Sequence, residues 1–205
     1  MGGHEASSLA TIAATWAVLV VLPGPNFLAV GHAAMASSRR TGLRVALGVA
    51  LGTAIWSTAA LVGVAALLRA AGWLERGVAL VGAAYLIAVG LRLVAAGRRE
   101  EALAADAGEA PRRPLLRGIA TDLSNPKAAA FFTGLFAAAV PVGAPLWFDG
   151  LLVATVTIIA AAWYALAASL LAVGPIAARY RRVRRWLGMA AGATFVLLGI
   201  RIAAD

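Results

Sequence analysis

Residues 6–38 read ASSLATIAATWAVLVVLPGPNFLAVGHAAMASS, a stretch without Asp, Glu, Lys or Arg. A helix needs about 20 apolar residues to cross the hydrocarbon core of a bilayer, so this stretch is long enough to span a membrane. The whole chain has the same character, since 62% of its residues are hydrophobic and 13% are charged. A soluble domain of 205 residues cannot hide that much apolar surface from water, which predicts an integral membrane protein.

Further uncharged windows follow along the chain, and together with the first they predict six transmembrane helices. Backbone groups in lipid must be paired within the spanning segment, and the alternating pattern of a β-barrel is missing. We therefore expect an all-α integral membrane fold. The predicted spans are 8–34, 44–68, 73–95, 115–140, 149–175 and 186–204.

Basic residues are concentrated in the first, third and fifth connections between these spans. The positive-inside rule places those connections in the cytoplasm and both termini outside. The net charge of +9 is explained by this topology, so no nucleic-acid partner is expected. The first span is not expected to be a cleaved signal peptide, because Glu5 is acidic where such peptides are basic.

The two halves of the chain resemble each other. Residues 82–92 and 191–201 both end in Gly, an aliphatic residue and Arg, and a helix-breaking motif recurs in the first span of each half. Because each half has an odd number of helices, the two halves must lie in the membrane with opposite orientations. Inverted repeats of this kind are typical of secondary transporters. The sequence predicts a first three-helix repeat at 1–97, a cytoplasmic linker at 98–114 and a second three-helix repeat at 115–205.

The first motif, Pro23-Gly24-Pro25-Asn26, falls near the middle of the first span. Two prolines remove two backbone donors within one turn, so we expect the helix to break and to free carbonyl groups inside the membrane. Asn26 supplies a donor and an acceptor at that break, which suits a polar binding site. The alternative is a structural kink packed against its neighbours.

The second motif runs from Asp122 to Lys127 and includes Asn125 and Pro126. An ionisable group within a span is a functional candidate, because its insertion costs about 2.5–3.5 kcal/mol on the translocon scale. Lys127 is the only lysine of the chain. Asp122 and Lys127 together suit proton coupling, or they form a plain salt bridge. If the helix begins later than expected, both groups lie at the cytoplasmic interface.

Other polar residues carry weaker signals. His32 can relay protons, but a lone histidine near the cytoplasmic end of a span is more often simply an interfacial residue. Gly48 and Gly52 form a GxxxG pattern on the second span, which allows close helix packing and is a candidate contact for a homodimer. No metal cluster, nucleophile–base pair or phosphate loop is present in the sequence, so neither an enzyme, a metal nor a cofactor is expected.

These motifs together resemble the lysine exporter (LysE/RhtB) family of bacterial amino-acid exporters. The similarity rests on Pro23-Gly24-Pro25, on Gly48 and Gly52, and on the run from Asn125 through Pro126 and Lys127 to Phe132. It implies ion-driven export of amino acids or their derivatives across the bacterial cytoplasmic membrane. Some members have an ionisable residue where this chain has Thr53, which leaves a coupling role of that position in doubt.

We therefore predict a secondary exporter of amino acids that is coupled to protons. Asn26, Asp122, Asn125 and Lys127 are the expected substrate or coupling residues, and Pro23, Gly24, Pro25 and Pro126 form the helix breaks. An uncoupled channel or facilitator for small solutes and a membrane protein with a purely structural role are the alternatives.

Overall fold

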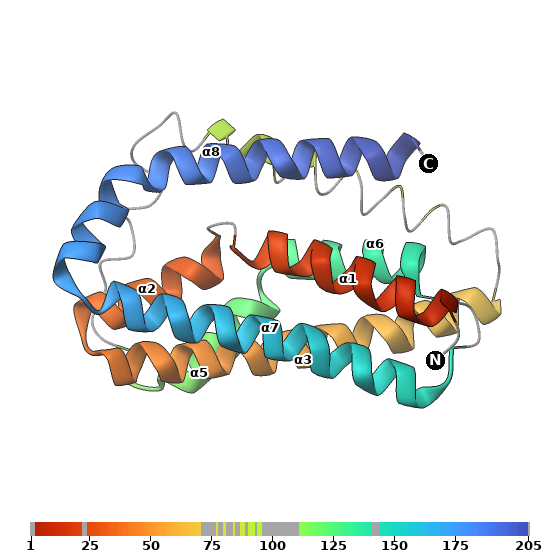
Figure 1. The fold of residues 1–205 in the computed structure, drawn as a ribbon, viewed down its shortest axis with the longest axis horizontal. Helices are drawn as coiled ribbons and strands as arrows, with labels where there is room; N and C mark the ends of the chain where they lie inside the picture. The colour runs from red at the N-terminus through yellow and green to blue at the C-terminus, as the bar shows by residue number, and fades with distance from the viewer. Residues whose placement is uncertain are drawn as a thin grey trace.

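The computed structural model describes residues 3–21, 24–70, 111–140 and 144–204, together with scattered positions between 77 and 95. Within these residues all regular secondary structure is α-helical, as predicted. Most of the predicted span 73–95 and of the linker 98–114 lies outside the described residues. The helices are α1 (Gly3–Val21), α2 (Pro25–Ala36), α3 (Arg39–Ala70), α5 (Pro114–Leu123), α6 (Pro126–Ala139), α7 (Leu146–Leu171) and α8 (Gly174–Ala204) (Figure 1).

Two of the predicted spans are broken helices. The first consists of α1 and α2, which are bent by 50° between Val21 and Pro25. The other consists of α5 and α6, which are separated between Leu123 and Pro126. Each second helix begins with proline, whose fixed φ suits the first helical position and whose missing N–H is not needed there. Helices thus end and restart at both motifs, and the two broken helices run in opposite directions (Figure 1).

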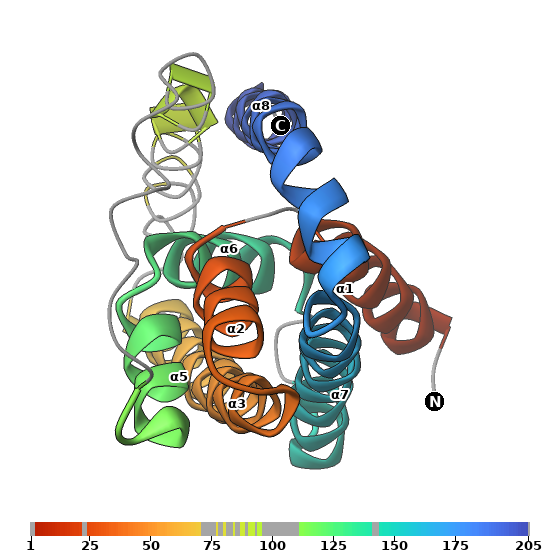
Figure 2. The same cartoon turned by 90° about the vertical axis from the view of Figure 1, so that its left-hand side faces the viewer.

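The hydrophobic core follows one face of α7. Its buried side chains recur at every fourth position, which is the spacing of one helix face. α7 packs against α1, α2 and α3, and α3 packs in turn against α5 and α6. Figure 2 shows α2, α3, α5 and α7 grouped side by side. The buried series is Leu152, Val156, Ala160, Tyr164 and Ala168.

The closest approach of α3 and α5 depends on glycines. A Cβ atom on Gly48 would lie 2.1 Å from the Leu115 carbonyl oxygen, and one on Gly118 would lie 2.1 Å from the Val45 carbonyl oxygen. Such distances are far shorter than any van der Waals contact, so only glycine fits at both places. The GxxxG pattern therefore serves packing within the chain, which removes it as the candidate homodimer contact.

α8 lies apart from this group, beside the segment that contains Gly90 (Figures 1 and 2). A Cβ atom on Gly90 would lie 2.5 Å from the Gly192 carbonyl oxygen, and one on Gly192 would lie 2.5 Å from the Gly90 carbonyl oxygen. The segments predicted to be the third and sixth spans thus contact each other through glycine. Their internal sequence repeat stays a prediction, because most residues of 82–92 lie outside the described part.

The described helices fit a membrane protein that crosses the bilayer several times. Arg39–Gly63 and Leu146–Leu171 are each long and apolar enough to span it, and the bent pair of α1 and α2 is a third candidate. Large apolar side chains such as Val62 and Ile158 are exposed on α3 and α7, as lipid contact requires. The predicted number of six spans is not established by these residues.

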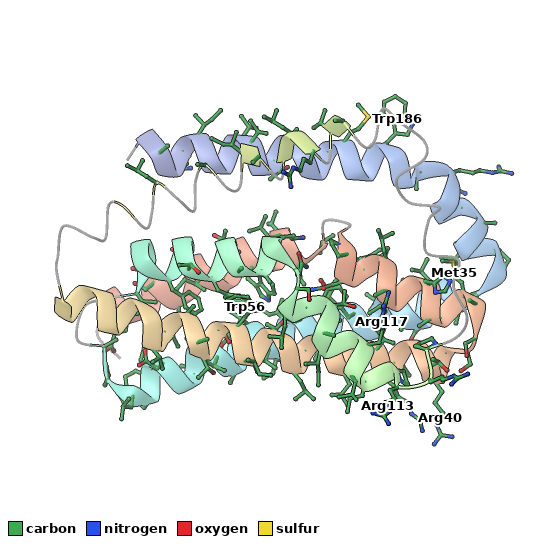
Figure 3. The ribbon with its side chains drawn as sticks, turned by 180° about the vertical axis from the view of Figure 1, so that it is seen from behind. Met35, Arg40, Trp56, Arg113, Arg117 and Trp186 are labelled. Atoms are coloured by element: carbon green, nitrogen blue, oxygen red, sulfur yellow. The ribbon has the colours of Figure 1, made fainter. Side chains whose placement is uncertain are left out.

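Charge and termini separate to opposite ends of the helices. The labelled Arg40 and Arg113 lie at one end, where α2 ends and where α3 and α5 begin (Figure 3). Both termini lie at the other end (Figure 1). This separation agrees with the distribution of basic residues from which the orientation was predicted.

Candidate functional site

The two helix breaks are joined by Lys127. Its Nζ atom donates a hydrogen bond of 2.7 Å to the backbone carbonyl oxygen of Leu19 on α1. In a continuous helix that carbonyl would accept from the backbone N–H of residue 23, but Pro23 has none. The ammonium group on α6 therefore replaces the donor that proline removes from α1. Lys127 is only 6% exposed, so its ammonium group lies inside the protein and not on its surface.

Asp122 makes the second connection between the breaks. Its Oδ1 atom accepts a hydrogen bond of 2.5 Å from Asn26 Nδ2 on α2. Asp122 is fully buried and Asn26 is 3% exposed. A Cβ atom on Gly52 would lie 2.8 Å from Asp122 Oδ2, so the absence of a side chain lets the α3 backbone pack directly against the Asp122 side chain. Each charged residue of the second break thus has a partner on the first broken helix.

The second break also frees a carbonyl group, and Trp56 bonds to it. Pro126 cannot donate to the carbonyl oxygen of Asp122, four residues before it. Trp56 Nε1 on α3 donates to this oxygen at 3.2 Å, and the backbone N–H of Asn125 donates to it at 3.0 Å. Figure 3 shows Trp56 between α3 and α6. Both breaks therefore follow one rule: a side chain from another helix donates to the carbonyl that a proline leaves without its helical partner.

Asn125 and Gly24 shape the starts of the second helices. The Asn125 Oδ1 atom caps α6 by accepting from the backbone N–H of Lys127 at 3.1 Å. Gly24 caps α2 without a side chain, and a Cβ atom there would lie 3.8 Å from Lys127 Nζ. The N-terminal end of α2, which carries partial positive charge, is therefore close to an ammonium group.

Three side chains that the sequence did not assign to the site belong to its surroundings. Thr53 on α3 faces Asp122 and is fully buried. Tyr164 on α7 is 3% exposed and interacts with Asn26. Trp56 is the third. The only sequence signal for these residues is that polar groups interrupt apolar windows, and the family resemblance leaves a coupling role of Thr53 in doubt.

Three buried oxygen atoms of the site have no hydrogen-bond partner. They are Asn26 Oδ1, Asp122 Oδ2 and Thr53 Oγ1, and they come from α2, α5 and α3 respectively. Buried polar atoms are nearly always paired in folded proteins, so unpaired oxygens that share one site call for an explanation.

Apolar residues close the site toward the end that carries the termini. Trp16 on α1 packs against Phe131 and Phe132 on α6, with ring centroids 4.8 Å apart in both pairs. Phe132 also contacts Phe136, and the Trp16 indole donates to the Val156 carbonyl oxygen at 2.9 Å. α1 and α6 both lie on the side of the breaks that faces the termini (Figure 1). The described structure is therefore closed on this side.

The remaining predicted site residues are less central. Pro23 lies outside the described residues, and His32 is partly buried on α2. Among the described residues, no group of three or more His, Cys, Asp or Glu side chains is arranged to hold a metal ion.

Comparison with known proteins gives one family and several related efflux proteins. A sequence model of the family described as LysE type translocator matches residues 17–205. The threonine efflux protein of Escherichia coli (strain K12) is 29% identical over 196 residues, which cover 94% of this chain and 95% of that protein. The threonine efflux protein of Salmonella typhi is 30% identical over 198 residues, with the same coverage.

A third relative matches over a shorter region. The leucine efflux protein of Klebsiella pneumoniae is 31% identical over 127 residues, which cover 62% of this chain and 60% of that protein. No solved structure matches the chain significantly.

Proposed function

The chain belongs to the LysE type translocator family, and we propose that it is a secondary transporter that exports amino acids or their derivatives across the bacterial cytoplasmic membrane. One structural observation carries the proposal. Two broken helices run in opposite directions, and a buried carboxylate, Asp122, and a buried ammonium, Lys127, connect their breaks within the apolar core. Related proteins that are named for threonine and leucine efflux support the substrate class.

The charges of the site match those of a zwitterion. The substrate carboxylate binds near Lys127 and the N-terminal end of α2, where a helix dipole favours anions. The substrate ammonium group binds near Asp122. Lys127 and Trp56 already bond to the carbonyl groups that the two prolines free, so these carbonyls are a weaker choice for the ammonium.

Asp122 is also the group through which we propose that export is coupled to protons. A proton that enters from outside neutralises the carboxylate, which then attracts the substrate ammonium less strongly and releases the amino acid. Loss of that proton on the cytoplasmic side restores the charge for the next substrate molecule. The orientation with both termini outside completes this proposal.

The test is an export assay in a bacterial host that lacks its own exporters. Cells are loaded with dipeptides rich in threonine or leucine, and the released amino acid is measured with and without a protonophore. We expect one amino acid to leave faster when the chain is present, and the protonophore to stop this excess. The Asp122→Asn and Lys127→Ala variants should lower the excess about tenfold or more, because each removes one charged partner.

Controls separate loss of transport from loss of folding. Asp149→Asn makes the same chemical change at the start of α7, outside the site, and should leave export unchanged. Membrane levels of all variants are measured in the same cells. Export that persists with the protonophore would favour an uncoupled facilitator. A fully inserted protein that releases no amino acid would contradict the exporter proposal.

A further inference from the structure

The three unpaired oxygens beside Asp122 have the chemistry of a binding site for one primary ammonium group. We propose that Asp122 Oδ2, Asn26 Oδ1 and Thr53 Oγ1 together receive the three N–H donors of a substrate ammonium. The inference deepens the exporter proposal and rests on it for the identity of the substrate. It assigns Thr53 to direct contact with the transported molecule.

The first argument is the number and type of the free atoms. An R–NH3+ group has three donors and no acceptor. The site has three acceptor oxygens without partners, and their residues are between 0% and 3% exposed. An unpaired buried polar atom costs about 1–3 kcal/mol, so a ligand that donates a hydrogen bond to each of the three oxygens removes this cost.

The second argument is charge. Asp122 contributes a carboxylate to the three oxygens, which favours a cation over a neutral hydroxyl or amide donor. The other oxygen of the same carboxylate is already fixed by Asn26 Nδ2 at 2.5 Å. This bond holds the carboxylate in one orientation, while the amide oxygen of Asn26 has no hydrogen-bond partner.

The third argument is the position of Thr53. Gly52 lets the α3 backbone pack directly against Asp122, because a Cβ atom there would lie 2.8 Å from Asp122 Oδ2. Thr53 follows Gly52 on α3 and interacts with the same carboxylate. The close packing thus places the threonine hydroxyl beside Asp122.

The test measures ligand binding and does not depend on transport. The purified full chain in detergent is heated with methylammonium, tetramethylammonium or sodium chloride, and with L-threonine or L-leucine. Methylammonium has three N–H donors and tetramethylammonium has none. We expect methylammonium and at least one amino acid to raise the unfolding temperature, and tetramethylammonium and sodium to add nothing beyond the effect of ionic strength.

Variants of Thr53 then identify the site. Thr53→Val keeps the shape and removes the hydroxyl, so the ligand concentration for half of the stabilisation should rise about tenfold, whereas Thr53→Ser should stay close to the wild type. Without ligand, Thr53→Val should be as stable as the wild type or more so, because an unpaired hydroxyl has been removed. Thr58→Val is the matched control, since Thr58 is an exposed threonine on the same helix.

The outcomes are distinct. Equal stabilisation of Thr53→Val and the wild type would overturn the inference, as would stabilisation by sodium that equals that by methylammonium. Absence of any methylammonium effect on the wild type would overturn it as well. None of these results would affect the exporter proposal, which depends on the export assay. Conversely, ammonium binding that requires the Thr53 hydroxyl would stand even if no amino acid were exported.

Discussion

Gly48 and Gly118 determine the distance between α3 and α5, because each lies against the backbone of the other helix. Asp122 follows Gly118 by four residues and therefore lies on the same face of α5. Four residues after Gly48 stands Gly52, beside the same carboxylate. The close crossing thus brings Asp122 to the part of α3 that carries Thr53.

A single methyl group tests this contact. Gly48→Ala should destabilise the protein by about 1–3 kcal/mol, because the nearest atoms belong to backbone that cannot move aside. Gly63→Ala on the same helix meets no atom within 4 Å and should be neutral or stabilising by up to about 1 kcal/mol. Thermal unfolding in detergent measures both variants. Equal effects of the two substitutions would contradict the close crossing.

At the scale of elements, the breaks were predictable and their partners were not. Proline removes a helical donor wherever it stands, so Pro25 and Pro126 indicate where helices must restart. Which side chain reaches the freed carbonyl depends on how the helices pack. The sequence singled out Lys127 for its charge, but its bond to Leu19 is a tertiary contact. Thr53 and Tyr164 stayed hidden because a single polar residue in an apolar helix has no periodic signal.

The contact between α1 and α7 gives a prediction at the same scale. Trp16→Phe keeps an aromatic ring against Phe131 and Phe132 but removes the donor to the Val156 carbonyl oxygen. We expect a loss of about 0.5–1.5 kcal/mol in unfolding free energy. Backbone amides of α1 should also exchange faster with deuterium, because this bond connects α1 to the core helix.

Trp147→Phe is the control for this substitution. Trp147 lies on α7 and is 50% exposed, so the same loss of an indole should leave the exchange of α1 unchanged. If α1 exchanged equally fast in both variants, the bond to Val156 would not be what holds it.

At the scale of the whole molecule, the basic residues predicted which connections share one side of the membrane. The structure places Arg40 and Arg113 at one end and both termini at the other (Figures 1 and 3). Composition was enough for the membrane class, and the missing alternation of a β-barrel was enough for the all-α fold. The described residues do not give the number of spans, because the predicted third span lies largely outside them.

The proposed orientation is testable because the chain contains no cysteine. Ser37→Cys introduces an exposed thiol at the arginine-rich end, and Gly150→Cys introduces one near the opposite end. In intact cells, a membrane-impermeant maleimide should label the Gly150→Cys variant and should label Ser37→Cys only after permeabilisation. The reverse pattern would place both termini in the cytoplasm.

The bond between Lys127 and the Leu19 carbonyl oxygen also bears on how the sequence can change during evolution. A substitution that restores an amide at position 23 would give this oxygen a donor from its own helix, and the ammonium group would no longer be needed there. Selection on the lysine would then come only from the transported molecule. Positions 23 and 127 belong to different halves of the chain, yet they are expected to vary together among descendants of a common ancestor.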